Sequence, residues 1–381
     1  MRSKIVVGFV FLSLAGFATL NHYLVRAGEQ IPVPGYKVLD PIRHGNLTVF
    51  PVVAAKTYPT SEFITLDEGL RSGEVVVTEA GSVQGLIRRP DAPIHRYDGA
   101  QVNRLVLVNN SKRPLLLLAG EVVSGGKQDR VIGKDRIVPA ESDPIDLSVF
   151  CVEHGRWVAT SEHFGASEAM YGKGGGIASG APVPMAIMVQ PSVRAKAMGD
   201  QNQQEVWDEV SKQKQELVSR VAPLAPTAGA EIGQVSSYAK VNENQEVRKY
   251  VDSIAKPVEQ SYQSLIHQLR DRNAVGVVVA VNGRIIWADI FASTDLLTKY
   301  WPKLVRSYAS EAVVTRAKDM DVTAKQAEVF LSEMEGRREM IESEPGIYRH
   351  TEVTGDGFKA FSLTSLLPKT AFEVHVAKMA D

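Results

Sequence analysis

Two neighbouring stretches, residues 119–130 and 148–157, hold most of the side chains that could do chemistry. Each begins in an apolar run, so its carboxylate, Glu121 or Glu153, stands where a strand leaves a hydrophobic core, and a charge there is costly unless it is paired. In one interpretation, these acids pair with nearby bases and fix the sheet. In the other interpretation, Lys127 and Arg130 hold an anion while a carboxylate orients or deprotonates a substrate group. The sequence leaves both interpretations open. The candidate ligand-binding residues are Glu121, Lys127, Gln128, Arg130, Glu153 and Arg156.

Cys151 is a second kind of candidate, because a cysteine three residues before His154 could act as a nucleophile with the imidazole as its base. In a strand, however, Cys151 and Glu153 share a face and His154 points to the other, so proton transfer between them needs an intervening turn. A lone cysteine in an apolar strand is more often a small buried hydrophobe. Glu121, Glu153 and Cys151 remain weak catalytic candidates, and the sequence does not decide whether the protein is an enzyme.

Metal and phosphate motifs are not recognisable. His154 and His163 could join Glu153 or Glu162, but the spacing matches no tight metal-ligand pattern. The glycine run at 174–176 lacks the order of a phosphate-binding P-loop. We therefore expect no metal site and no cofactor.

The composition is that of an ordinary folded protein, with 44% hydrophobic and 23% charged residues. The chain has 43 Lys+Arg and 44 Asp+Glu, a balance that argues against nonspecific binding to nucleic acid or to an anionic membrane. Its one cysteine cannot form a disulfide within the chain, so stability must come from the core.

The first residues have the pattern of a targeting segment. Arg2 and Lys4 precede an uncharged, mostly apolar run from Ile5 to Leu20, and a small-x-small cleavage signal ends at Ala27. Residues 1–27 are thus expected to be a signal peptide or, if uncleaved, an N-terminal anchor, which would be the protein's one membrane contact. Both interpretations predict an exported protein, periplasmic or secreted.

The periodicity predicts an α+β fold with a strand-rich N-terminal half. Strands are expected at 46–55, 74–78, 83–88, 102–109, 115–119, 136–139 and 145–153. One short helix is expected after Thr65, whose spacing to Glu68 is that of a capping box. A long glycine-bearing loop follows at 165–184.

Helices dominate the middle and the C-terminal half. Apolar spacing predicts one helix opened by Asp200, one over 244–270 that Pro257 kinks or splits, and others over 294–316 and 323–341. Asn282-Gly283 predicts an antiparallel hairpin over 275–291 with a type I′ turn. The tail alternates, with Glu373 and His375 on the polar side, and predicts a half-buried strand paired with 358–363.

Several short motifs together resemble one domain family. They are Gly120-Glu121, Gly126-Lys127-Gln128 with Arg130, Val138-Pro139-Ala140, Cys151-Val152-Glu153, Gly155-Arg156-Trp157, Phe291, Lys303-Leu304 and Ser307-Tyr308. As a set they resemble the uncharacterised bacterial family named for its genomic association with ADP-ribosylglycohydrolases and rhodanese-phosphatases. The resemblance covers about 46–316 and leaves 317–381 as a helix-plus-strand extension. Asp129 and His154 depart from the Asn and Gln common in the family, so a mechanism that depends on His154 would not be shared.

The resemblance implies a link to NAD- or ADP-ribose-derived metabolism through gene neighbours, which is association rather than mechanism. With the residues above, it leads us to expect an exported small-molecule binding domain for a nucleotide- or ADP-ribose-like anion. A noncatalytic structural or interaction module of the cell envelope and a cysteine-dependent enzyme are the alternatives.

Overall fold

The computed structural model describes residues 35–80, 104–153, 161, 163–165, 187–269, 273–316, 318 and 320–381. The leader, the strand expected at 83–88, most of the loop expected at 165–184, and the residues His154, Arg156 and Glu162 lie outside this range. The described part contains both sheets and helices, so the α+β prediction is confirmed.

A nine-stranded antiparallel sheet, here called the large sheet, joins both ends of the described chain. Its order is β1-β3-β14-β15-β19-β18-β17-β16, with β2 also paired to β3. The strands are β1 Tyr36–Val38, β2 Ile42–His44, β3 Leu47–Ala54, β14 Asn273–Val281, β15 Arg284–Phe291, β16 Arg337–Glu344, β17 Tyr348–Gly355, β18 Phe358–Ser365 and β19 Glu373–Ala380. The residues after 316 therefore complete the same sheet that β3 begins.

The hairpin between β14 and β15 is confirmed. Asn282 and Gly283 have φ values of 52° and 71°, the two positive angles that a type I′ turn requires. The pairing of β18 with β19 is confirmed as well.

The second β region lies between β3 and β14 in the sequence. Here β12 pairs with both β5 and β8, so that β5, β6, β11, β9, β8 and β12 close into a ring, which we call the barrel. β13 extends it beside β8, and β10, β7 and β4 form a small separate sheet. The strands are β4 Ile64–Thr65, β5 Val75–Glu79, β6 Arg104–Asn109, β7 Leu115–Leu117, β8 Glu121–Gly125, β9 Arg130–Ile132, β10 Arg136–Val138, β11 Ile145–Cys151, β12 His163–Gly165 and β13 Ile187–Met188.

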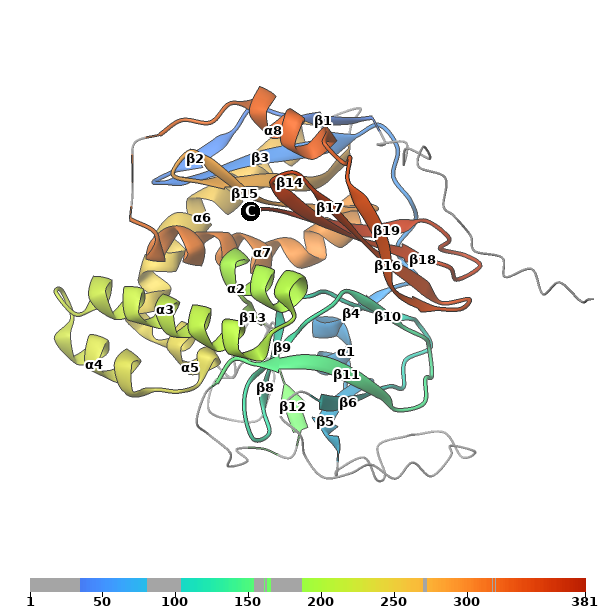
Figure 1. Ribbon diagram of the computed structural model, residues 1–381, viewed down its shortest axis with the longest axis horizontal. Coiled ribbons are helices and arrows are strands. Elements are labelled where there is room, and N and C mark those ends of the chain that lie inside the picture. The colour runs from blue at the N-terminus through green and yellow to red at the C-terminus, as the bar shows by residue number, and fades with distance from the viewer. Residues whose placement is uncertain are drawn as a thin grey trace, which may run out of the picture. The chain divides into compact units, whose positions relative to one another are not determined.

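Helices cover both faces of the large sheet. One face of the sheet packs against α6 and α7 and forms the largest hydrophobic core, and α8 packs on the opposite face. Figure 1 shows that α6 and α7 lie between the sheet and the barrel. The helices are α1 Leu66–Ser72, α2 Pro191–Ala195, the π-helix η3 Lys196–Asp200, α3 Gln203–Val221, α4 Pro226–Gln234, α5 Tyr238–Glu243, α6 Gln245–Gln268, α7 Thr294–Val314 and α8 Ala324–Ser332. None of the helices in the described part is long and apolar enough to span a bilayer.

The capping box at the start of α1 is confirmed: Thr65 accepts from the Glu68 backbone and Glu68 accepts from the Thr65 backbone. The predicted start of α3 needs correction, and so does one of the two alternatives predicted for Pro257, the split. α3 is capped by Asn202 rather than Asp200, because Asp200 ends the π-helix and Gln201 takes a φ of 48° that breaks the chain direction. α6 runs through Pro257 as one helix and is not split.

The helix predicted over 323–341 was wrong in its second half. α8 ends at Ser332, and Arg337–Glu344 forms β16, which pairs with β17. Gly336 lies so close to the backbone of β17 that an added Cβ would be 2.3 Å from the Thr354 carbonyl oxygen. The strand conformation of 337–344 results from pairing with a strand that comes later in the sequence. Local periodicity carries no information about that pairing.

The tail strand was predicted to be half-buried, and this was also wrong. His375 on β19 is 0% exposed, and Lys378 on the opposite face is 1% exposed. The reason is tertiary: α8 covers one face of the sheet, and Asp135, from the segment after β9, contacts the other through His375.

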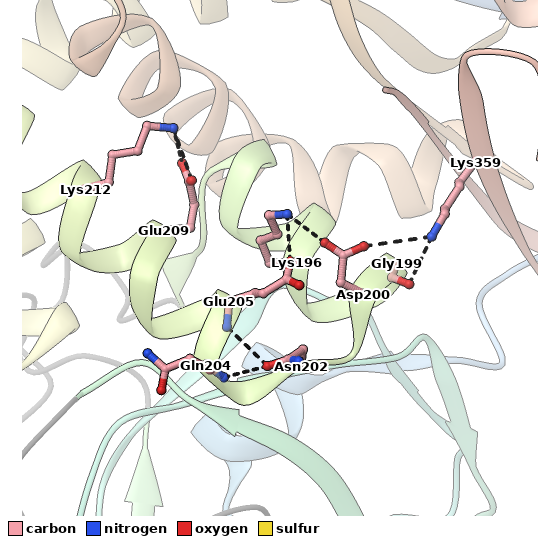
Figure 2. A network of polar contacts seen from close by, with 9 residues as sticks. All are labelled: Lys196, Gly199, Asp200, Asn202, Gln204, Glu205, Glu209, Lys212 and Lys359. Carbon is pink, nitrogen blue, oxygen red and sulfur yellow. Dashed lines mark hydrogen bonds and ion pairs between the residues drawn. The ribbon is translucent and has the colours of Figure 1, made fainter.

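A surface network ties the helical layer to the large sheet. Figure 2 shows Lys196 between Asp200 and Glu205, with Nζ to carboxylate distances of 2.8 Å. Lys359 of β18 donates to the Gly199 carbonyl at 3.1 Å and lies 3.9 Å from Asp200. The network holds the π-helix beside β18. Because its charged groups are about one-third exposed or more, it contributes little to stability.

Candidate functional site

Glu121 pairs with a base from a helix rather than with the bases of its own stretch. Lys303 on α7 places its Nζ 2.5 Å from Glu121 Oε1 and 2.5 Å from Asp67 Oδ2 on α1. The second oxygen of Glu121 accepts the Leu118 N–H at 2.8 Å. Glu121, at the start of β8, points toward α7. Its carboxylate therefore does not lie with the other described residues with which it was grouped from the sequence.

This triad has two carboxylates and one ammonium, all buried. Burial raises the pKa of Glu121, and the charge of Asp67 raises it further against the opposing effect of Lys303. Burial alone would lower the pKa of Lys303, but Asp67 and Glu121 outweigh it and the pKa is raised. Lys303 is therefore a firmly charged ammonium between two acids.

A second buried set of charges surrounds His375. Its Nδ1 is 2.6 Å from Asp135 Oδ2 and its Nε2 is 3.1 Å from Asp289 Oδ1. Arg194 on α2 donates to Asp289 Oδ2 at 2.8 Å, and Tyr308 donates to the same oxygen at 2.5 Å. Burial alone would lower the pKa of His375, but the two carboxylates raise it to about 9, so the ring is an imidazolium that donates from both nitrogens.

Residues 118–121, between β7 and β8, connect the two sets. Asp135 accepts the Ala119 N–H at 2.8 Å, next to the Leu118 N–H that Glu121 binds. Gly120 has a φ of +94°, and an added Cβ would be 2.9 Å from Arg194 Cδ. We call the combined set the buried ionic layer; its members are Asp67, Glu121, Asp135, Arg194, Asp289, Lys303 and His375.

Of the other predicted residues, Lys127, Gln128, Arg130 and Glu153 meet where the turn between β8 and β9 reaches the end of β11, and Arg156 lies outside the described residues. Glu153 accepts the Asp129 N–H at 3.0 Å through Oε2, and its carbonyl accepts from Gln128 Nε2 at 2.9 Å. The Lys127 N–H donates to Glu79 Oε1 at 3.0 Å. We call this group the turn cluster; its members are Glu79, Lys127, Gln128, Arg130 and Glu153.

Arg130 lies at the centre of the turn cluster. It is 0% exposed, stands opposite Cys151 in the strand pairing, and interacts electrostatically with Glu79, Asp129 and Glu153. Burial lowers the pKa of its guanidinium, although these acids act in the opposite direction. The group remains a cation at neutral pH, held among carboxylates.

Two acceptors of the turn cluster are buried and receive no hydrogen bond from any described residue. They are Glu79 Oε2 and Gln128 Oε1, to which no donor within the described ranges is bonded. Glu79 is 7% exposed and Gln128 5%. A buried acceptor without a donor costs about 1–3 kcal/mol, so these two oxygens call for a partner that donates.

Cys151 is a buried, hydrogen-bonded thiol. Its Sγ donates to the Glu153 carbonyl at 2.9 Å and accepts the Glu153 N–H at 3.3 Å. Burial raises its pKa, and a thiol of raised pKa forms little of the reactive thiolate. Arg130 and the hydrogen bonds of the thiol act to lower this pKa, but burial outweighs them.

No three His, Cys, Asp or Glu side chains of the described ranges are grouped to hold a metal ion. His163 lies in β12, opposite Thr78, and the remaining ligands considered from the sequence, His154 and Glu162, are outside those ranges.

The structure thus brings Lys127, Gln128, Arg130 and Glu153 together and sends Glu121 to Lys303. Both groups are completed by residues that no sequence motif pointed to: Glu79 in the turn cluster, and Asp67, Asp135, Arg194, Asp289 and His375 in the buried ionic layer. One signal was available, since Asp289 is the one charged residue among the seven that follow Arg284 in β15. Asp67 gave none, because an acid in the first turn of a helix is ordinary.

The comparisons with known proteins agree with the motifs. The sequence matches no curated protein and no solved structure. Residues 35–377 match the model of the ARG and Rhodanese-Phosphatase-superfamily-associated Protein domain, a range that extends on both sides of the motifs. Because this match covers most of the chain, the protein belongs to that family, as the motifs predicted.

Proposed function

We propose that this domain binds a small polar molecule at the turn cluster. The observation that carries the proposal is the pair of buried acceptors, Glu79 Oε2 and Gln128 Oε1, beside the guanidinium of Arg130. A ligand with hydroxyl or amine donors would satisfy the two oxygens, and an anionic group on the same ligand would face Arg130 and Lys127. Sugar hydroxyls next to a phosphate, as in a nucleotide or an ADP-ribose-like compound, have this chemistry.

The charges of the turn cluster limit the kind of ligand. Glu79 and Glu153, with the adjacent Asp129, provide three carboxylates against the two cations Lys127 and Arg130. A site with this balance does not attract a dense anion from a distance. Recognition should therefore depend on the hydroxyl groups, and inorganic phosphate alone should bind weakly.

Calorimetric titration of the purified protein with ADP-ribose, ribose 5-phosphate, ribose and inorganic phosphate tests the proposal, with melting temperature as a second measure. We expect binding of the sugar phosphates and at least a tenfold weaker response to phosphate, because a buried polar group left unpaired discriminates strongly.

The variant for this test is Glu79→Gln, which keeps the shape and replaces an acceptor oxygen by an NH2 group. It should abolish the sugar-phosphate response, whereas Glu62→Gln, at an exposed pair with Lys369, should not. If none of the four probes binds, or if both variants bind like the parent, the turn cluster is not a site for this class of ligand.

The export proposal rests on residues 1–27 alone, with their basic start and apolar run. We propose that the chain is exported and that this segment is a signal peptide or an anchor. The intact mass of the protein recovered from the producing cell, by fraction, decides it: a chain shortened at about residue 27 outside the cytoplasm supports cleavage, and a full-length cytoplasmic chain refutes export.

A noncatalytic structural or interaction module is the second candidate, and the buried ionic layer favours it. Every charge of that layer contacts an opposite charge within the protein, and none of its side chains is more than 7% exposed. If the family's motif residues serve mainly to hold this layer, their substitution should change stability without any ligand effect. The titrations above separate the two candidates.

A further inference from the structure

The turn cluster is held by the residues that start α5. Asp129, at the end of the turn between β8 and β9, accepts the Ser237 hydroxyl at 2.6 Å and the Ala239 N–H at 3.1 Å through Oδ2. Glu153 accepts the Ser236 hydroxyl at 2.9 Å through Oε1. Asp129 is 2% exposed and Glu153 is 0% exposed. Donors from residues 236–239 thus bind two buried carboxylates beside the proposed ligand site.

α5 in turn depends on this contact. It has six residues, Tyr238–Glu243, and a helix of that length is not stable by itself in water. Its N-cap is Ser237, whose hydroxyl accepts the Lys240 N–H at 3.2 Å and donates to Asp129. The carboxylate also lies at the end of the helix where a negative charge is favourable. Loss of the contact with Asp129 should therefore unwind the start of α5.

Glu153 connects the start of α5 to one of the two buried acceptors. Its second oxygen, Oε2, accepts the Asp129 N–H at 3.0 Å, and its carbonyl accepts from Gln128 Nε2 at 2.9 Å. The bond to Gln128 Nε2 orients the amide and with it Gln128 Oε1, the acceptor that receives no hydrogen bond from a described residue. The Ser236 hydroxyl in turn fixes the side chain of Glu153. The start of α5 therefore positions an acceptor that the proposed ligand would use.

We propose that the turn cluster and the start of α5 order and open as one unit, so that a bound ligand stabilises α5 and an undocked α5 lowers the affinity. Ser236 and Ser237 are then positioning residues of the site. The effect on affinity rests on the binding proposed above, whereas the joint opening does not. Linkage makes the effect reciprocal: the free energy by which the ligand stabilises α5 equals the free energy by which α5 strengthens binding.

Cys151 reports the joint opening without any ligand. Its Sγ donates to the Glu153 carbonyl at 2.9 Å and accepts the Glu153 N–H at 3.3 Å, and Cys151 is 0% exposed. A thiol reagent reaches it when the residues that cover it, Glu153 among them, move apart. Because Glu153 is held by Ser236 and by the turn, weakening the start of α5 should raise the rate at which the native protein is labelled.

Two substitutions at helix caps separate this coupling from a general loss of stability. Ser237→Ala removes the hydroxyl that Asp129 and α5 share. Thr323→Ala is the matched control, because it removes the N-cap hydroxyl of α8, on the face of the large sheet away from α6 and α7. Both variants lose the same kind of cap, so their losses of global stability should be similar. Ser236→Ala, at an exposed position, removes the contact with Glu153 alone and should act in the same direction.

The full chain is used for three measurements. Cys151 should be labelled by dithionitrobenzoate about fivefold faster or more in Ser237→Ala than in Thr323→Ala under native conditions. Ribose 5-phosphate, titrated by calorimetry, should bind Ser237→Ala about fivefold more weakly or worse, and should bind Thr323→Ala like the parent. In the parent, saturating ribose 5-phosphate should slow hydrogen exchange at the amides of Ala239 and Lys240.

The outcomes that overturn the proposal differ for its two parts. Equal labelling rates in Ser237→Ala and Thr323→Ala overturn the joint opening. Equal affinities of the parent and Ser237→Ala for ribose 5-phosphate overturn the effect on binding, as does exchange in α5 that does not respond to the ligand. A parent that binds no ribose 5-phosphate refutes the proposed function and the effect on affinity with it, and the labelling rates still decide the joint opening. If Ser237→Ala does not fold, Ser236→Ala takes its place in each comparison.

Discussion

The buried ionic layer and the turn cluster are built from the same residue types and differ in how completely they are paired. In the layer, each charge has an opposite charge within hydrogen-bond distance, and residues 118–121 are held by two of its carboxylates. In the turn cluster, Glu79 and Gln128 each keep a buried acceptor that no donor in the described ranges binds. In the layer the atoms without a hydrogen bond to a described residue are the donors Nε and Nη2 of Arg194, whose guanidinium lies over the Trp287 ring, whereas in the turn cluster they include two acceptors.

This difference separates two roles for polar residues in one domain. A buried network in which every charge meets an opposite charge costs desolvation and favours one specific arrangement of the elements that carry it, here α1, α2, α7, β15 and β19. Two buried acceptors, Glu79 Oε2 and Gln128 Oε1, receive no hydrogen bond from a described residue, and a ligand that donates to them would remove the free-energy cost of leaving them unpaired. Motif residues are present in both, so membership in a motif does not by itself indicate a binding role.

The largest effect should follow from removing the ammonium of the layer. Lys303→Met leaves Asp67 and Glu121 buried without their cation, and we expect a loss of about 3–5 kcal/mol in the free energy of unfolding. Urea denaturation measures it. Lys299→Met, on the same helix in a partly exposed pair with Glu68, should cost about 1 kcal/mol or less. Adding Glu121→Gln to Lys303→Met should recover part of the loss; an unchanged midpoint for Lys303→Met would show that the layer does not hold the fold.

The imidazolium of His375 predicts a pH dependence. Its pKa is raised from 6.5 to about 9 in the folded state, so the stabilisation is complete below pH 6.5 and is lost as the pH rises through about 9. The free energy of unfolding should fall by on the order of 2 kcal/mol between about pH 6 and pH 8. Burial lowers the pKa of Lys378 to about 8 in the folded state. Its deprotonation above this pH makes the free energy of unfolding rise with pH, opposite to the effect of His375.

Urea midpoints at constant ionic strength give this slope. His375→Gln should flatten it, and His44→Gln, at an exposed position, should leave it unchanged. A slope that persists in His375→Gln would assign the titration to another group.

A smaller loss is expected at the segment that joins the two halves of the layer. Gly120→Ala places a Cβ 2.7 Å from the Met188 sulfur at a φ of +94°, which other residues rarely adopt. We expect a loss of about 1–3 kcal/mol, measured by thermal or urea unfolding. Gly35→Ala, with nothing within 4 Å of the added carbon, is the control. Equal melting temperatures for the two variants would contradict the close packing of Gly120 on Arg194.

The smallest effect should be at Cys151. A disulfide reagent such as dithionitrobenzoate should label it slowly, if at all, in the native protein and rapidly after unfolding, because the thiol is 0% exposed and its pKa is raised. Rapid native labelling would restore the cysteine-dependent enzyme as a candidate and would show that the turn cluster opens to solvent.

Much of the local structure could be predicted from the sequence because its causes are local. The Asn282-Gly283 turn and the Thr65 capping box depend on residues within a few positions of each other. The segment 337–344 could not be predicted in this way, since its strand conformation comes from pairing with β17 and later strands. The sequence singled out Lys127, Gln128, Arg130 and Glu153 by residue type, and they meet because β9, which follows the turn at 126–129, pairs with β11, which Glu153 follows.

The sequence by itself determined the fold class, the family and the Asn282-Gly283 hairpin turn, because propensity, motif spacing and turn chemistry are properties of neighbouring positions. The tertiary structure alone decided the partners of the charges. Lys303 reaches Glu121 across 182 positions and Asp135 reaches His375 across 240, and such contacts depend on how helices and sheets pack rather than on any local pattern. A buried charge pairs with the opposite charge that packing places next to it. Leaving it unpaired would cost more free energy than local backbone propensity can contribute.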